Sequence, residues 1–230
     1  MKKGVFIETG NVTRMRTVMR QSLDTERGRP GMVAVWGAAG LGKTLTAQQC
    51  YAEHGGVYLR AWEDWSQSGM LQSVCESLGG GTPHGSQRCK RAIIKLLDDE
   101  PGQVIFMDEA DRLAIKRIED LRDIYDCTGT PIVLIGEPGL PVKLDARERI
   151  GGRIPDEYRV AFEKITATDI LLYAQEAAGL SLTPEACALL AQRSQGVFRK
   201  AHNMLLSLEQ AAAAAETHEV DAAMVRGVRA

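Results

Sequence analysis

A glycine-rich segment near the start of the chain restricts the possible folds more than any other feature of the sequence. It reads Gly37-Ala38-Ala39-Gly40-Leu41-Gly42-Lys43-Thr44, which matches the pattern G-x-x-x-x-G-K-[ST]. The apolar run Met32–Trp36 before it is typical of a buried strand, and a helix is expected from Lys43 to about His54. A strand, a glycine-rich turn and a helix in this order predict a phosphate-binding loop.

The residue types in this loop suit the binding of ATP. Glycines allow backbone N–H groups to surround the phosphates where a Cβ would intrude. Lys43 is expected to reach the β- and γ-phosphates, and the hydroxyl of Thr44 is expected to bind Mg²⁺. The predicted nucleotide-binding residues run without a break through the loop and into the helix: Gly37, Ala38, Ala39, Gly40, Leu41, Gly42, Lys43, Thr44 and Leu45.

A second part of the site is predicted at Val104–Glu109, where an apolar strand ends in two acids. Ligands of open parallel sheets bind at the carboxyl ends of the strands. Asp108 is therefore expected to hold Mg²⁺, directly or through water. Glu109 is the expected catalytic base that orients the attacking water, which a hydrolase requires and a small-molecule kinase does not.

The rest of the chain predicts an α/β core followed by a helical region. Further strands are expected at Val57–Leu59 and Pro131–Ile135, with helices between them, which indicates a parallel sheet covered on both faces. Beyond about Thr166 only helices are expected. We predict an N-terminal helix and the segment leading into the core in residues 1–30, the α/β core in 31–165, and a small all-helical lid domain in 166–230. The polar stretch 24–31 is expected to be a loop.

The composition sets limits on the class of protein. The chain has 230 residues and a formal net charge of -2. This low net charge argues against a protein that binds nucleic acid through its overall charge, but it does not exclude a local basic face. No apolar stretch is long enough to span a bilayer or to act as a signal peptide, so no membrane partner is expected. The five cysteines form no C-x-x-C pair, which favours free thiols and a cytoplasmic location.

Several segments together resemble a known family. They are Phe6-Ile7-Glu8-Thr9 with Asn11-Val12, the phosphate-binding loop, Asp108-Glu109-Ala110-Asp111-Arg112-Leu113, Ile135-Gly136-Glu137-Pro138 and Gly196-Val197-Phe198-Arg199. The chain resembles AAA+ P-loop ATPases of the transposition target-selector group, above all the transposition B proteins of Mu-like phages. The resemblance covers nearly the whole chain.

The resemblance implies a function in transposition. It implies ATP-dependent polymerisation on double-stranded DNA, without sequence preference, as a homo-oligomer or helical filament in the cytoplasm of a bacterial host. It also implies delivery of that DNA to a transposase. The Mu relatives carry a helix-turn-helix region before the ATPase domain, whereas here the phosphate-binding loop begins at Gly37, so DNA contacts are expected from the ATPase core.

The same resemblance assigns roles to three further residues. Arg199 is similar to the second sensor of AAA+ proteins, an arginine that touches the γ-phosphate. Arg153, with Arg149 as second choice, stands where a finger is expected to project into a neighbouring subunit's site, which would require an oligomer. Glu137 stands at the position of a γ-phosphate sensor, but an acidic side chain there would repel phosphate, and a simple loop glutamate is the alternative.

A basic helix face offers a candidate DNA contact. Helix spacing places Arg88, Arg91 and Lys95 on one side of a helix expected over Gln87–Leu97, beside the glycine-rich loop 79–86. Such a face could contact phosphates without reading bases. The alternative is a solvated face balanced by the acids that follow.

Two other functions stay open at this point. One is an AAA+ ATPase that drives a protein partner without binding DNA. The other is a small-molecule P-loop kinase, which would leave Glu109 and the helical region without a role.

Overall fold

The computed structural model describes residues 1–2, 4–24 and 30–228. Residues 25–29, which belong to the loop expected at 24–31, lie outside the described residues. The chain divides into two compact units. The sheet unit comprises Val12–Ala38 and Lys43–Ala161, and the helical unit comprises Met1–Asn11, Ala39–Gly42 and Phe162–Ala230. The domain boundaries expected at residues 30 and 165 stay a prediction.

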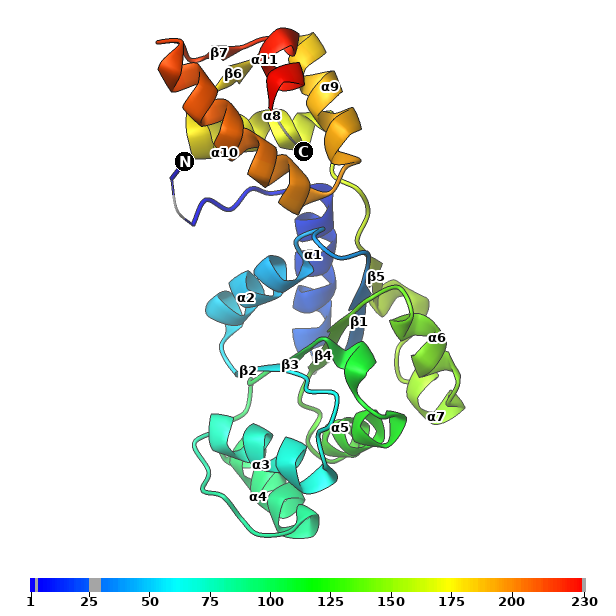
Figure 1. Ribbon diagram of the computed structural model, residues 1–230. Coiled ribbons are helices and arrows are strands. Elements are labelled where there is room, and N and C mark those ends of the chain that lie inside the picture. The colour runs from blue at the N-terminus through cyan, green and yellow to red at the C-terminus, as the bar shows by residue number, and fades with distance from the viewer. Residues whose placement is uncertain (3, 25–29, 229–230) are drawn as a thin grey trace. The chain divides into compact units, whose positions relative to one another are not determined.

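The sheet unit is built on a five-stranded sheet in the order β2-β3-β4-β1-β5 (Figure 1). Every pairing in it is parallel, which confirms the predicted α/β core. The edge strand β5 has three residues and was not expected, because a run this short shows no periodicity. The strands are β1 Met32–Trp36, β2 Val57–Arg60, β3 Ile105–Asp108, β4 Ile132–Gly136 and β5 Arg159–Ala161.

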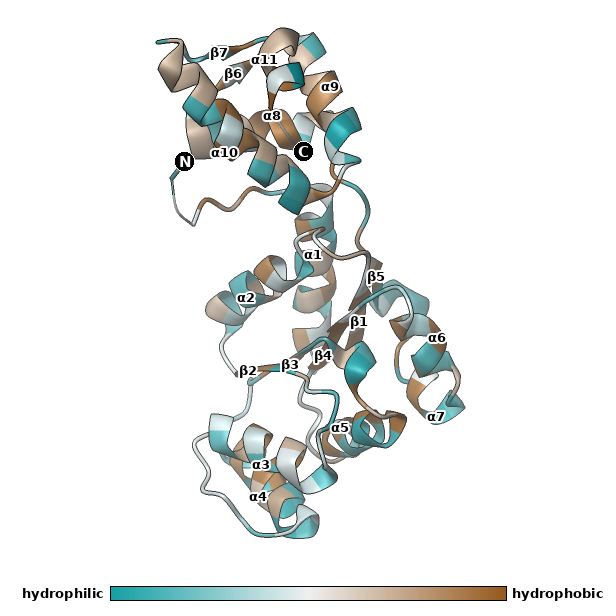
Figure 2. Cartoon of the chain, in the orientation of Figure 1, coloured by the Kyte–Doolittle hydropathy of each residue, from teal (hydrophilic) through white to brown (hydrophobic). Residues whose placement is uncertain are grey.

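The central strands form the core of this unit. All residues of β3 and β4 are buried, as are the first four of β1. Figure 2 shows these strands as largely hydrophobic, while hydrophilic residues gather on the surrounding helices. Strands that are apolar on both faces need helices on both sides, and this explains the alternation of strands and helices along the chain.

The helices of the sheet unit pack in more than one layer. Helix α2 contacts β2, β3 and β4, α3 contacts β2, α5 contacts β4, and α6 contacts β1. Helix α4 packs on α3 and α5 (Figure 1), which leaves its other side for solvent. The short helices α6 and α7 were not expected from the sequence. The bounds are α1 Gly10–Leu23, α2 Lys43–His54, α3 Gln67–Ser77, α4 Ser86–Asp99, α5 Ile115–Thr128, α6 Leu140–Asp145 and α7 Glu148–Gly151.

The helical unit contains the expected C-terminal helices around their own core. Thr166 and Thr183 cap α8 and α9 with their side chains, and Pro184 follows Thr183 in the first turn of α9. A π-helical turn, Ala174–Ala178, continues α8, where one regular helix was expected. The helices are α8 Ala167–Tyr173, α9 Pro184–Ser194, α10 Phe198–Ala214 and α11 Ala222–Gly227.

This unit is not purely helical. The strands β6 (Ser181–Leu182) and β7 (Glu219–Val220) form a two-stranded parallel pair. The expectation of helices alone is corrected on this point. Two-residue strands from distant segments carry no pattern of their own, because only their pairing defines them. Within the described ranges, no helix combines the length and the apolar character needed to cross a membrane.

Candidate nucleotide-binding site

The predicted phosphate-binding loop has the backbone that its glycines allow. Gly40 and Gly42 have positive φ angles of 81° and 97°, in the region that side chains other than glycine rarely adopt. A Cβ on Gly40 would also lie 2.9 Å from Val197 Cγ1. The backbone N–H of Arg199 donates a hydrogen bond of 3.0 Å to the carbonyl oxygen of Gly40. Two of the three glycines from Gly37 to Gly42 are thus required by backbone shape.

The lysine of the loop is folded back on the loop itself. Lys43 is the first residue of α2, and its side chain is largely buried. Its Nζ donates hydrogen bonds to the carbonyl oxygens of Gly37, at 2.7 Å, and Ala38, at 3.0 Å. The ammonium group is therefore held over the turn in which phosphate would bind. Leu45, the last predicted residue of the site, is 53% exposed.

Asp108 ends β3 and is held by three donors. Its Oδ2 accepts a hydrogen bond from Thr44 Oγ1 and another from Tyr58 Oη, each 2.8 Å long. Its Oδ1 accepts one from the backbone N–H of Glu109, at 2.9 Å. The structure thus brings together Thr44 and Asp108, the two residues for which the sequence predicts Mg²⁺ binding. Two oxygen donors of this kind suit Mg²⁺, which binds through few protein oxygens together with substrate phosphates.

Glu109 has an unusual backbone and two cationic neighbours. Its φ and ψ of 55° and 35° lie in the left-handed region, which is rare for a residue other than glycine. Its Oε1 forms an ion pair with Arg60, the last residue of β2, and its Oε2 lies 2.5 Å from Arg112 Nε. The hydrogen bond to Glu109 raises the pKa of Arg60. Non-glycine residues held in this region cluster at functional sites.

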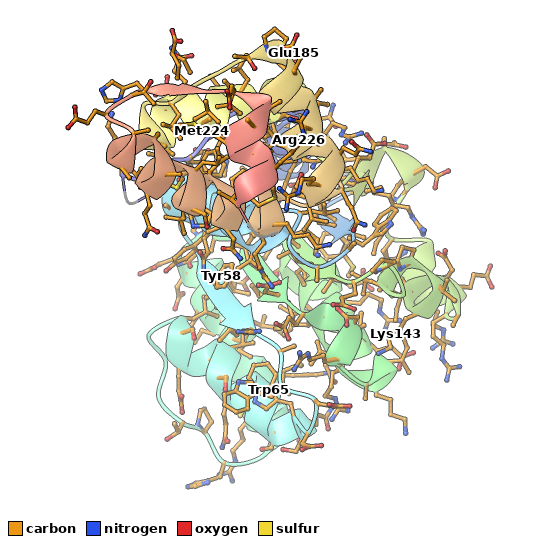
Figure 3. The ribbon with its side chains drawn as sticks, turned by 45° about the horizontal axis from the view of Figure 1, so that its top comes forward. Tyr58, Trp65, Lys143, Glu185, Met224 and Arg226 are labelled. Carbon is orange, nitrogen blue, oxygen red and sulfur yellow. The ribbon has the colours of Figure 1, made fainter. Side chains whose placement is uncertain are left out.

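Tyr58 is a functional candidate that the sequence did not reveal. It lies on β2 (Figure 3) and donates its hydroxyl to Asp108 from the neighbouring strand. Burial raises the pKa of Tyr58 far above its usual value, and the charge of Asp108 and the hydrogen bond to it raise it further. The hydroxyl therefore remains a neutral donor. A tyrosine in a short strand carries no motif, so only the strand pairing could identify it.

The loop after β4 contains the position expected for a sensor. The side chain of Glu137 is exposed, and its backbone N–H donates to Asp111 Oδ1 at 2.9 Å. Lys143 donates to the carbonyl oxygens of Asp111 and, at 2.8 Å, Leu113. Asp111 therefore joins the turn after β3 to the loop after β4. This structural role accounts for the aspartate at the end of the Asp108–Asp111 segment.

The two predicted arginines lie in different units. Arg153 follows α7 in the sheet unit and binds the carboxylate of Asp126 with two hydrogen bonds, of 2.8 and 3.2 Å. Hydrogen bonding to Asp126 raises the pKa of Arg153. Arg149, the second choice, is exposed. Arg199, the second residue of α10 in the helical unit, is also exposed, and its backbone is anchored to Gly40.

The predicted DNA-contact residues share an exposed face of α4. Arg88, Arg91 and Lys95 are all exposed, and no ion pair is recorded for them in the described part of the chain. Lys90, on the same helix, instead binds Asp120, at 2.7 Å, and Asp123, at 2.9 Å, both on α5. One side of α4 is thus attached to α5, and the other presents three cations to solvent. We call this set of three the α4 basic face.

Comparison with known sequences places the chain among related proteins. The AAA domain pattern matches residues 26–144, about half of the chain. The ATP-dependent target DNA activator B of Escherichia phage D108 is 31% identical over 135 residues, which cover 57% of this chain and 41% of that relative. The match therefore spans about two fifths of the relative's length. These findings confirm the predicted resemblance and support the predicted ATPase activity.

Solved structures share the fold. The Thermotoga maritima RuvB Holliday junction branch migration motor has a TM-score of 0.61 and 18% identity, covering 95% of this chain and 68% of that chain. A single-substitution variant of Thermotoga maritima RuvB reaches a TM-score of 0.65 with the same identity and coverage. At this identity the likeness concerns the fold, and it confirms the predicted P-loop α/β architecture.

Proposed function

This chain belongs to the AAA domain family, and from that membership we propose that it is an ATP-dependent, sequence-independent DNA-binding ATPase. In this proposal it oligomerises on double-stranded DNA and delivers that DNA to a transposase, in the cytoplasm of a bacterial host. The name of the phage relative, an ATP-dependent target DNA activator, supports this choice over other tasks of the fold.

One observation carries the nucleotide part of the proposal. Thr44, Asp108 and Glu109 are linked by hydrogen bonds at the end of β3, and Lys43 lies over the turn that leads into α2. In the proposed mechanism, Lys43 exchanges its bonds to the loop carbonyls for the β- and γ-phosphates of ATP. The backbone N–H groups of Gly37–Thr44 surround the same phosphates, and the adjoining Leu45 completes the segment.

Thr44 and Asp108 are the proposed residues for Mg²⁺. A hydroxyl has one hydrogen and two lone pairs, so Thr44 can donate to Asp108 and still offer a lone pair to a metal ion. Bound Mg²⁺ would neutralise charge that develops on the phosphates. The protein's own part is to hold both oxygen donors 2.8 Å apart, as they are in the structure.

Glu109 is the proposed base that orients the attacking water. Both of its carboxylate oxygens are paired, with Arg60 and Arg112, but a carboxylate has about four lone-pair sites, so Glu109 can accept from a water beside these partners. Arg60 is 69% exposed, and exposed ion pairs contribute little stability, so its pairing with Glu109 could also open when ATP binds.

Two arginines are the proposed stabilisers of the transition-state charge. We assign Arg199 to the same subunit and Arg153 to the neighbouring subunit, with Arg149 as the second choice for the latter. A finger acting in trans makes the site complete only in an oligomer. In an assembly, Arg153 would release Asp126 and bind the phosphates of ATP in the neighbouring subunit. This change of partner would couple ATP hydrolysis to assembly.

The α4 basic face is the proposed DNA contact. Three exposed cations on successive turns can bind phosphates of either strand without reading bases, and this fits a sequence-independent binder. Asp98, Asp99 and Glu100 follow at the end of the helix and are exposed, but no ion pair joins them to Arg88, Arg91 or Lys95 in the described residues.

The test is fluorescence anisotropy of a labelled random-sequence DNA duplex, titrated with protein in the presence of ATP, of ADP and of no nucleotide. We expect tight, cooperative and salt-sensitive binding with ATP alone. The Lys43→Ala variant is the matched control and should show no response to ATP. No binding in any nucleotide state would overturn the DNA part and direct the function toward an AAA ATPase that acts on a protein partner.

A further inference from the structure

Tyr58 lies outside the phosphate-binding loop and contacts the carboxylate of Asp108, which is proposed to bind the metal ion. Its hydroxyl donates to Asp108 Oδ2 at 2.8 Å, the oxygen that also accepts from Thr44. We propose that Tyr58 is a positioning residue, which holds the carboxylate of Asp108 in the orientation that Mg²⁺-ATP requires. The inference rests on the proposed function, because it concerns the same metal site.

The parallel pairing of β2 with β3 creates this contact. Tyr58 pairs with Phe106, and Arg60 pairs with Asp108. Alternate residues of a strand share a face, so Tyr58 and Arg60 lie on one face of the sheet beside Phe106 and Asp108. A tyrosine is long enough to pass along its neighbour and reach the residue two positions further on, whereas Arg60 reaches Glu109.

The ring of Tyr58 is fixed by an aromatic cluster. It stacks on Phe106 with a centroid distance of 6.3 Å and an interplanar angle of 29°, and it lies 5.9 Å from the ring of Tyr51 on α2. Phe106 is fully buried and also contacts Tyr51 edge-on. Rings packed in this way have few accessible rotamers, so the hydroxyl is directed at one place.

The two donors to Asp108 Oδ2 differ in what ATP binding does to them. Thr44 belongs to the segment that takes up phosphate and metal, so its hydroxyl is shared with the ligand. Tyr58 belongs to the sheet, and its bond to Asp108 is independent of the loop. Partners of this second kind orient metal-binding groups, and their loss typically costs about 10- to 100-fold in metal affinity or activity. The hydroxyl of Tyr58 is therefore expected to matter most when Mg²⁺ is scarce.

Two single variants separate the hydroxyl from the ring. Tyr58→Phe keeps the ring and its stacking but removes the donor to Asp108. Tyr51→Phe removes a hydroxyl from the same cluster, and this hydroxyl has no recorded bond to Asp108 within the described ranges. Both variants keep the apolar contacts of the cluster, and circular dichroism melts would check that each folds as the unchanged protein does.

The primary readout is equilibrium binding of a fluorescent ATP analogue, titrated with Mg²⁺ at fixed nucleotide, with EDTA as the metal-free reference. We expect Tyr58→Phe to raise the Mg²⁺ midpoint about 10-fold. Binding in EDTA should be unchanged, and Tyr51→Phe should match the unchanged protein. In steady-state hydrolysis the Mg²⁺ KM should rise by a similar factor, while kcat at saturating Mg²⁺ stays within about twofold.

A double variant tests whether Tyr58 acts through the carboxylate. In an Asp108→Asn background, Tyr58→Phe should have no further effect on the Mg²⁺ midpoint, because the group that it positions has lost its charge. Equal midpoints in Tyr58→Phe and the unchanged protein, or an equal shift in both backgrounds, would overturn the inference. If the unchanged protein bound no nucleotide, or bound it without response to Mg²⁺, the proposed function itself would fail.

Discussion

The nucleotide site and the α4 basic face use charge in opposite ways. At the nucleotide site, the charged groups are engaged inside the protein: Lys43 with loop carbonyls, Asp108 with Thr44 and Tyr58, and Glu109 with two arginines. On α4, three cations are exposed, and no ion pair is recorded for them among the described residues. These charged residues all belong to the sheet unit.

The difference follows from what each region is proposed to recognise. A phosphoryl-transfer site must hold its groups in one geometry before the substrate arrives, so burial and hydrogen bonds within the protein position them. A surface that binds any DNA sequence needs only cations that release counterions from the phosphates, and exposed, flexible side chains suffice. Substitutions should therefore have large, position-specific effects at the site and small, additive ones on α4.

The largest effect is expected for Glu109→Gln. A positioned side chain that accepts a proton in the transition state typically contributes about 10²- to 10⁴-fold to the rate, so steady-state ATP hydrolysis should fall by about that factor. Fluorescent ATP analogue binding should persist, and ATP should trap the assembled state on DNA. Glu63→Gln, an exposed acid beyond β2, is the control and should hydrolyse ATP at the unchanged rate. Normal turnover by Glu109→Gln would show that another group orients the attacking water.

A somewhat smaller effect is expected for Lys43→Ala, on binding rather than on turnover. Two hydrogen bonds from a charged donor, each worth about 1.5 kcal/mol or more, correspond to about a 100-fold loss of ATP affinity. Equilibrium titration with the same fluorescent analogue measures this loss. Lys116→Ala on α5 removes an exposed lysine and is the control. Retained affinity in Lys43→Ala would show that the loop backbone alone holds the phosphates.

The smallest of these effects is expected for DNA binding by the triple variant Arg88→Ala, Arg91→Ala and Lys95→Ala. If each cation contacts one phosphate, the slope of log affinity for DNA against log salt should become shallower by about three units. ATP binding should persist. A control triple, Lys164→Ala, Lys200→Ala and Arg226→Ala, removes the same charge from exposed positions of the helical unit. An unchanged slope in the α4 variant alone, or an equal change in both triples, would place the DNA contact elsewhere.

Sequence patterns predicted the longer elements of the fold and missed the shortest ones. The strands β1 to β4 and the helices α2 to α5 lie where apolar runs and periodicity predicted them, because each has enough residues to show a pattern. The expected spacing of Arg88, Arg91 and Lys95 on one helix face agrees with their exposure. The strands β5, β6 and β7 and the helices α6 and α7 were missed, because they are short and form through contacts with distant segments.

The sequence by itself determined the parts of the site that are contiguous in the chain. The glycines at 40 and 42, Lys43 and Thr44, and the acids at 108 and 109 depend on local backbone shape and on residue type, which a motif records. The tertiary structure decided which side chains surround them. Tyr58 and Arg60 reach Asp108 and Glu109 only because β2 pairs with β3 in one register, and Lys90, which helix spacing places off the α4 basic face, has ion-pair partners only because α5 presents Asp120 and Asp123. Such contacts join residues far apart in the chain, and strand order, register and helix packing set them together.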